Sequence, residues 1–169
     1  MSSCIGDLTA LTNVDPAKFK AAMRCIASTV NVITSGEGVA INGMTATAVC
    51  SVSAAPPCIL IVVNQENRSH ALIEKTGAFA VNVLSAWQKS LALHFASKTA
   101  MPFESVAHRA GITNAPILEG CAAYLECVVE NQTKSGTHSI FVGRVVSSGE
   151  TDRSPLLYWN GEFVTFGEQ

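Results

Sequence analysis

The sequence predicts a mostly β fold with flanking helices, in which an antiparallel barrel carries its helices on the outside. Three observations favour this class. Strand-like segments outnumber helical ones, and they gather toward both ends of the chain instead of alternating with helices. No GxGxxG motif follows a predicted strand, which argues against a Rossmann domain. With 169 residues, 48% of them hydrophobic, the chain is long enough for one well-buried core and too short for two ordinary domains. We therefore expect a single domain over residues 1–169, of which residues 1–14 form a loose N-terminal segment.

The first elements are a helix and a strand. Asp15 followed by Pro16 is typical of an N-cap and a first-turn proline, so we expect a helix that continues to about Ser28. The apolar residues that recur at helical spacing, and predict that it packs on an apolar surface, are Phe19, Ala22, Met23 and Ile26. Residues 29–34 are β-branched and strand-like, and residues 35–38 are expected to turn.

Residues 42–57, NGMTATAVCSVSAAPP, form the most informative run. Read as one strand at period two, the run has a hydroxyl face and a small apolar face. The hydroxyl face holds Thr45, Thr47, Ser51 and Ser53, and the other holds Met44, Ala46, Ala48, Cys50 and Val52. Such a strand lets a ligand approach its backbone, where N–H groups and hydroxyls bind phosphate or the polar edge of a flat heterocycle. The alternative is a strand whose hydroxyls pair across a sheet.

The remaining elements are short. We expect strands over residues 58–63, 78–84, 124–131 and 139–147, with two closing strands over 156–159 and 163–166 around Gly161. One helix covers residues 69–75 and ends at Gly77. A second helix, capped by Ser85, carries Trp87, Leu91 and Phe95 at spacings of four. Residues 98–115 are expected to be irregular.

Composition limits the partners. The net charge is −2 and Lys and Arg do not cluster, which argues against nucleic acid. A mean hydropathy of +0.29 with 14% charged residues leaves more apolar surface than a small monomer hides, so we expect a homodimer. The chain has no apolar run of membrane-spanning length and no signal-peptide pattern at its start, so we expect a cytoplasmic protein without membrane contact.

Cysteines and histidines are scattered. The six cysteines form no CxxC pair and are expected to be small buried hydrophobes in a reducing compartment. They are Cys4, Cys25, Cys50, Cys58, Cys121 and Cys127. The four histidines show no HxxxH or HExxH spacing, so no metal site is expected.

Taken together, the segments of the chain resemble a known family. In order they read DPAKFKAAM, STVNVITS, NGMTATAVCSVSAAPPCILIVV, FAVNVLSAWQKSLALHFA, NAPILEGCAAYLECVVE, GTHSIFVGRVV and PLLYWNGEF. This order is similar to that of the flavin reductase family with the split-barrel flavin-binding fold, and above all of the small reductase components of two-component flavin-dependent monooxygenases. The resemblance implies a homodimer that binds FAD or FMN and oxidises NADH or NADPH. It also implies release of reduced flavin to a separate oxygenase that hydroxylates an aromatic compound.

The resemblance assigns flavin contacts to three segments. Bordering the isoalloxazine ring, with backbone N–H groups near its polar edge, would be Met44, Thr45, Ala46 and Thr47. Holding the ribityl and phosphate portion would be Ser51, Val52 and Ser53. Near the phosphates would lie Asn67, Arg68 and Ser69, with Asn82 and Leu84 close by. Taken alone, Arg68 reads as a solvated loop charge and Asn82 as a strand-end amide that caps a turn.

His138 is the candidate catalytic residue. In the family, Gly-Asp-His commonly precedes this strand, with the histidine near the flavin and the nicotinamide, but this chain has Gly136-Thr137-His138. The acid that would orient the imidazole or favour its protonated form is therefore replaced. Tyr158 and Trp159 would cover the nicotinamide or the ring edge, and the alternative for both is a place in the core or an interface.

Two other functions compete with this one. A flavin-binding or flavin-sensing module of the same fold would bind FMN tightly without oxidising NADH. An oxidase similar to the pyridoxamine phosphate oxidases would carry more basic residues for a substrate phosphate than this chain has. In a reductase, hydride passes between the two cofactors, so the protein contributes stacking and alignment.

Overall fold

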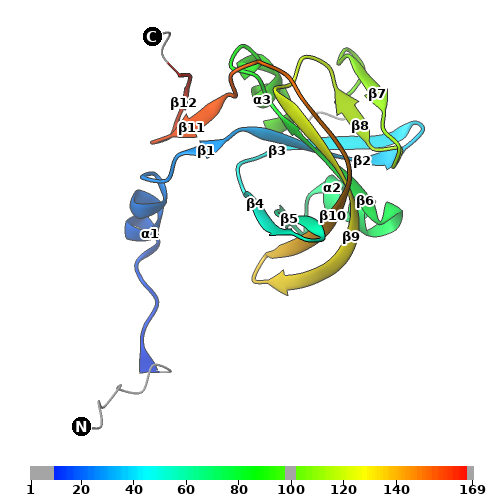
Figure 1. The fold of residues 1–169 in the computed structure, drawn as a ribbon. Helices are drawn as coiled ribbons and strands as arrows, with labels where there is room; N and C mark the ends of the chain where they lie inside the picture. Colours follow the sequence, from blue (N-terminus) through cyan, green and yellow to red (C-terminus); the bar gives the residue numbers. More distant parts are fainter. Residues whose placement is uncertain (1–9, 98–101, 167–169) are drawn as a thin grey trace.

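One antiparallel sheet organises the molecule (Figure 1). The computed structural model describes residues 10–97 and 102–166. Within them, seven strands pair in the spatial order β3, β2, β6, β9, β10, β5, β4, and every neighbouring pair is antiparallel. In that order the strands are Ala40–Ala46, Asn31–Glu37, Ala78–Val83, Ala123–Ser135, His138–Glu150, Pro57–Asn64 and Val49–Ala54. The predicted mostly β class is confirmed.

The sheet curls until its two edges approach each other. β3 and β4 are the opposite edge strands, yet only Thr47 and Ala48 separate them along the chain. A flat seven-stranded sheet would be about 29 Å wide, whereas the three Cα–Cα steps from Ala46 to Val49 cover at most about 11 Å. The Val62 N–H also donates to the Ala48 carbonyl (3.3 Å), next to β5. The sheet therefore forms a barrel that is split between β3 and β4.

The run of residues 42–57 forms two strands, so the single strand expected for it is wrong. β3 ends before Thr47, and β4 begins on the other edge of the sheet. Within β4, a bulge at Val52 shifts the register again, because Ser51 pairs with Ile59 while Ser53 pairs with Cys58. The period-two pattern passes through a crossing and a bulge, so its hydroxyls do not share one face.

α1 (Pro16–Met23) stands away from the sheet (Figure 1). The Asp15 carboxylate caps it as predicted, by accepting the N–H groups of Ala17 (2.9 Å) and Lys18 (3.2 Å). The helix ends at Met23, earlier than expected, with Arg24 as its C-cap. β1 (Ser28–Thr29) follows and pairs with β11 (Leu157–Trp159), which pairs with β12 (Glu162–Val164). All residues of α1 are exposed, so the described part of this chain does not supply the apolar surface expected beneath it. Residues 1–9 of the predicted loose segment lie outside the described residues.

Two further helices pack on the sheet. α2 (Arg68–Thr76) contacts β2, β3, β5 and β6, inserts Ile73 into the core and ends at Gly77, whose φ of 66° suits glycine. α3 (Lys89–Ala96) begins later than expected, and Ser85 does not cap it. The Ser85 hydroxyl donates instead to the carbonyl of Gly120. In the described ranges, no helix is long and apolar enough to cross a membrane.

The core has an inner and an outer part. Inside the curled sheet, the largest fully buried side chains are Ile33, Ile61, Ile73, Phe79 and Phe141. Gly143 of β10 lies so close to the Phe79 ring that a Cβ there would be 2.6 Å from it, and only glycine fits. Between the sheet and α3, a second cluster contains Val32, Leu84, Phe95 and Leu156.

Some expected boundaries are wrong. Residues 98–101 lie outside the described residues, but the rest of the segment expected to be irregular contains β7 (His108–Ala110), which pairs with β8 (Pro116–Leu118). β2 continues to Glu37, so the chain turns at Gly38 rather than from residue 35. Long-range pairing, which local turn chemistry does not report, decides both cases.

The cysteines divide into two groups. Cys58, Cys121 and Cys127 are buried, as expected. Cys25 and Cys50 are exposed, so the expectation of burial is wrong for them. Cys4 lies outside the described residues.

Candidate active site

The two edges of the split offer backbone groups and small side chains. In the described part of the chain, β3 pairs only with β2 and β4 only with β5, so the outward backbone groups of both edges have no strand partner. β4 reads VCSVSA and is largely exposed, although it carries no charge. Soluble proteins normally cover or charge such an edge. The split therefore presents a surface that suits a flat ligand or a second subunit.

The residues before the crossing turn their side chains into the protein. Met44 and Ala46 are half-buried and pack against the inner core. The Thr45 hydroxyl donates to the Ala92 carbonyl of α3 (2.6 Å), so it is already engaged. Thr47, at the crossing, is exposed. Apart from Thr47, this segment offers a ligand its backbone rather than its side chains.

The two serines of β4 differ. Ser51 is exposed, and so is Val52 at the bulge, which is 51% exposed. Ser53 is half-buried, and its hydroxyl oxygen accepts the N–H of Ala55 (3.1 Å), which stabilises the turn after the strand. Ser51 is therefore the serine whose hydroxyl is available to a ligand.

The start of α2 combines a helix N-terminus with a cation. Asn67 is the N-cap, and its Oδ1 accepts the N–H of Ser69 (2.9 Å). The Ser69 side chain is buried and accepts a hydrogen bond from Asn42 Nδ2 (2.8 Å). Arg68, the first helical residue, is exposed. Of the three residues predicted to lie near phosphates, Arg68 therefore has the side chain that faces solvent, beside the positive end of the helix dipole.

Asn82 and Leu84 are fully buried. Asn82 Nδ2 donates to the Val32 carbonyl (3.2 Å), and its Oδ1 accepts the Leu118 N–H (2.8 Å). Leu84 belongs to the outer core under α3. Their geometry gives no support to direct contact with a cofactor, and it indicates that both residues hold strands together.

His138 lies at the start of β10, next to the turn of the β9–β10 hairpin. Its side chain is exposed, and its Nδ1 is 2.9 Å from the hydroxyl oxygen of Thr137. Its main chain is also fixed, since Gln65 Nε2 donates to the His138 carbonyl (3.1 Å). The threonine that replaces the expected acid is thus the direct neighbour of the imidazole.

Thr47 and Tyr158 share a cleft of about 430 Å³ between α1 and β11. Tyr158 is 38% exposed and packs edge-on against Phe163, with 5.4 Å between ring centroids. Lys20 of α1 and Arg24, the C-cap of the same helix, bring two positive charges to the same cleft. Trp159, the neighbour of Tyr158, is 49% exposed.

The register relates these positions to one another. Ala48, next to Thr47, bonds to Val62 of β5, and two residues later Asn64 pairs with His138. Thr47 and Tyr158 therefore line one cleft at an end of the split, whereas His138 lies on β10, separated from β4 by β5. Ser51 lies a short way along β4, and Arg68 follows just beyond the end of β5. Small uncharged strand edges near a helix N-terminus are features that suit a flat ligand that carries phosphate.

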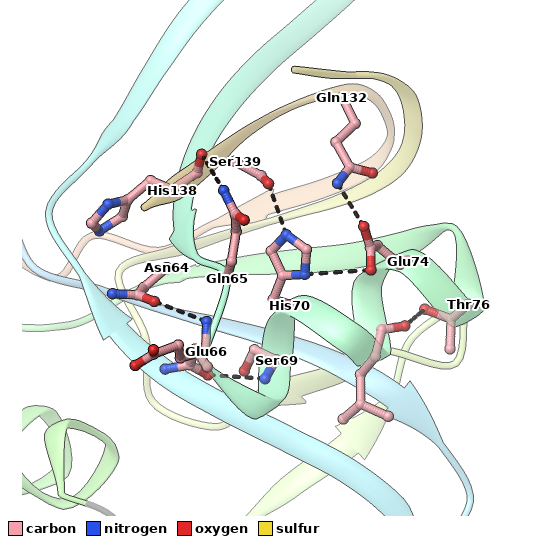
Figure 2. A network of polar contacts seen from close by, with 12 residues as sticks. Asn64, Gln65, Glu66, Ser69, His70, Glu74, Thr76, Gln132, His138 and Ser139 are labelled. Carbon is pink, nitrogen blue, oxygen red and sulfur yellow. Dashed lines mark hydrogen bonds and ion pairs between the residues drawn. The ribbon is translucent and has the colours of Figure 1, made fainter. Parts of the chain in front are cut away.

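Sequence reasoning missed a polar network under this site (Figure 2). Its members are Gln65, His70, Glu74, Gln132 and Ser139. The spacing of His70 and Glu74, one helical turn apart, was the signal that could have revealed part of it. The contacts to the hairpin join residues far apart in sequence, and no local pattern predicts them.

Comparison with known proteins identifies the family. Residues 23–167 match the family model described as Flavin reductase like domain, and the chain belongs to this family. The reductase component of the 4-nitrophenol 4-monooxygenase/4-nitrocatechol 2-monooxygenase of Rhodococcus opacus is 37% identical over 158 residues, which cover 92% of this chain and 84% of the relative. An NADH-dependent flavin reductase of Rhodococcus sp is 31% identical over 167 residues, 96% of this chain and 92% of the relative.

A solved structure gives the same result. The NADH:FAD oxidoreductase of Streptomyces globisporus, in complex with NAD and FAD fragments, superposes with a TM-score of 0.86 at 32% identity. The match covers 93% of this chain and 98% of that one. The family resemblance, the split-barrel class and the enzyme class predicted from the sequence are confirmed.

Proposed function

We propose that this chain is an NAD(P)H:flavin oxidoreductase that reduces FAD or FMN and supplies free reduced flavin to a separate monooxygenase. The family and the named activities of its relatives support the reaction. The structural observation that carries the proposal is the split between β3 and β4, where the described chain has two uncharged edges whose outward backbone groups pair with no strand. The N-terminus of α2 follows β5, and His138 lies on the other side of β5, at the start of β10.

The residues at the split fit a flavin. The backbone N–H groups at the crossing from β3 to β4 are donors for the polar edge of the isoalloxazine ring. The exposed Ser51 hydroxyl suits the ribityl and phosphate portion, and Arg68 with the N-terminus of α2 suits the phosphate. The small side chains of β4 leave room for a flat ring to lie against the strand.

His138 is the proposed catalytic residue. When bound, the flavin accepts a hydride from the nicotinamide, so the cofactors carry the reactivity. The Thr137 hydroxyl, 2.9 Å from His138 Nδ1, orients the imidazole. Because a hydroxyl is uncharged, it fixes the ring without the electrostatic support that a carboxylate gives an imidazolium. His138 then aligns the nicotinamide or supports charge that develops on the reduced flavin.

We further propose that the protein works as a homodimer. α1 is exposed along its whole length, and its apolar side chains have no cover in the described chain. Phe19 is 54% exposed and Met23 is 47% exposed. These residues line the cleft that also contains Thr47 and Tyr158, so a second subunit packed on α1 would complete one wall of the active site.

The proposed partner is an oxygenase that hydroxylates an aromatic compound, by analogy with the Rhodococcus opacus relative. We propose the cytoplasm as the compartment, because the five described cysteines are free, as is usual in reducing surroundings.

The test is oxidation of NADH and of NADPH by the purified protein, with FAD, with FMN and without added flavin. We expect turnover that requires flavin, and hydrogen peroxide in air when no oxygenase is present. Tight binding of FMN without oxidation of either nucleotide would instead favour the non-catalytic flavin-binding module.

A further inference from the structure

A buried histidine, His70, contacts the residue that follows His138 in β10 (Figure 2). His70, in the first turn of α2, is 6% exposed, and its Nε2 is 2.8 Å from the hydroxyl oxygen of Ser139. Ser139 is fully buried and follows His138 in β10. Because successive residues of a strand point to opposite faces, His138 points outward while Ser139 points to His70.

Glu74 sets the hydrogen-bonding pattern of the His70 ring. Its Oε2 is 3.4 Å from His70 Nδ1, and an ionised carboxylate only accepts hydrogen bonds, so Nδ1 carries the hydrogen. In the neutral ring, Nε2 is then the acceptor for the Ser139 hydroxyl. The other Glu74 oxygen accepts from Gln132 Nε2 (2.7 Å). The ring is further held edge-on by Phe141, with 5.2 Å between centroids.

These contacts clamp the hairpin that carries His138 against α2. His70, at the start of α2, contacts Ser139 of β10, and Glu74, one turn later, contacts Gln132 of β9. The helix therefore holds both strands of the hairpin. From the other side, Gln65 Nε2 donates to the carbonyls of Gly136 (3.2 Å) and His138 (3.1 Å). The main chain on both sides of His138 is therefore held by the side chains of Gln65 and His70.

We propose that His70 is a positioning residue for flavin reduction, which sets His138 relative to the phosphate-binding start of α2 through its contact with Ser139. The inference rests on the proposed function. His70 follows Arg68 by two residues in the same helical turn, so one side chain joins the segment proposed to hold the flavin phosphate to the strand that carries the proposed catalytic histidine. The contact at Nε2 carries this link, whereas the contact at Nδ1 only fixes the ring.

Three substitutions separate these contacts. In His70→Gln the amide reaches the place of Nε2, in His70→Asn it reaches only that of Nδ1, and His70→Phe keeps the ring without either nitrogen. In stopped-flow reduction of flavin by NADH, we expect His70→Phe and His70→Asn to lower the hydride-transfer rate about tenfold, the scale of a small misalignment. His70→Gln should stay within about twofold of the unchanged protein, and flavin affinity should move by less than about threefold in all three.

A double-mutant cycle tests whether His70 acts through His138. In a His138→Ala background, His70→Phe should cause no further loss of rate, because the group that it positions is gone. Losses that multiply would overturn the inference. The matched control is His94→Phe, since His94 also packs edge-on against a phenylalanine and holds a carbonyl, that of Pro102 (2.7 Å), but lies on α3. We expect this control to leave the hydride-transfer rate unchanged.

Imidazole ¹⁵N spectra of the flavin-free protein give a readout that needs no catalysis. We expect the His138 signals to move in His70→Asn and to return in His70→Gln. Unmoved signals in both variants would overturn the inference, even if His70→Phe fails to fold. If the signals move as expected but the unchanged protein reduces no flavin, the proposed function falls and the positioning contact stands.

Discussion

Removing one hydroxyl tests the flavin site most directly. Ser51→Ala deletes an exposed side chain from β4 and should leave the fold intact, since surface substitutions usually change stability by less than about 0.5 kcal/mol. Ser53→Ala is not equivalent, because it also removes the acceptor for the Ala55 N–H. The geometry therefore makes Ser51 the cleaner probe of the ribityl and phosphate subsite.

The expected loss of affinity follows from the kind of bond. A hydrogen bond to a charged group contributes about 1.5 to 3 kcal/mol. The edge of β4 is open to water on one side, so the lower end applies, about 1.5 kcal/mol or slightly more than tenfold in Kd. Ser53→Ala should instead lower the free energy of unfolding by about 1 kcal/mol, the cost of one neutral hydrogen bond in a turn.

Flavin titration by fluorescence quenching measures the Kd, and urea unfolding of the same samples separates affinity from stability. The matched control is Ser148→Ala, an exposed serine at the other end of β10, which should change neither quantity. If Ser51→Ala binds FAD and FMN as the unchanged protein does, the ribityl and phosphate portion does not lie against β4, and the placement proposed for the flavin is refuted.

His138→Ala should lower the hydride-transfer rate about ten- to a hundredfold, about 1.4 to 2.7 kcal/mol of activation free energy, with a much smaller change in flavin affinity; an unchanged stopped-flow rate would leave His138 an ordinary surface residue. Burial raises the pKa of the Cys121 and Cys127 thiols to about 12, so iodoacetamide at about pH 8, followed by peptide mass mapping, should modify exposed Cys50 and spare both. Because their folded pKa exceeds the ordinary value of 9.0, the stability that they contribute is complete below pH 9 and is lost as pH rises toward 12, which urea unfolding at a series of pH values would report. Phe19→Lys, which places a charge on the exposed apolar side of α1, should shift the proposed dimer toward monomer in light scattering and weaken flavin binding; a dimer of full affinity would contradict an interface at α1.

Local signals predicted the elements that local chemistry controls. The cap at Asp15 and the left-handed glycine at Gly77 are where the sequence indicates, because each depends on neighbouring residues alone. The break at Thr47 and Ala48 could not be predicted in this way. Residues on both sides of it are equally small and uncharged, so periodicity continues while the backbone changes edges. Barrel closure, which depends on all seven strands, decides where the run divides.

The predicted site residues divide for a similar reason. Thr47 and Tyr158 come together in one cleft, whereas His138 lies at the start of β10, with β5 between it and β4. Asn82 lies in β6 and Leu84 directly follows it, and the sequence does not reveal that β8 contacts Asn82 and that α3 packs on Leu84. An asparagine in a strand indicates a polar partner, but only the fold determines whether that partner is a ligand or, as here, a neighbouring backbone.

The uncharged, exposed edge of β4 suits ligand binding, but it also exposes the split to pairing with other chains. An uncharged, exposed edge strand is a template for pairing with other chains, and β4 has neither a lysine nor a proline within Val49–Cys50–Ser51–Val52 to prevent it. A ligand or subunit that covers the edge adds its binding free energy to the stability of the folded state, about 2.7 kcal/mol at a concentration one hundred times Kd. A reductase that releases its reduced flavin gives up that contribution in every turnover. In the proposed homodimer, the partner subunit packs on α1 and stays bound when the flavin leaves. It therefore covers the surface beside the active site throughout the cycle, whereas the flavin covers the edge only while it is bound.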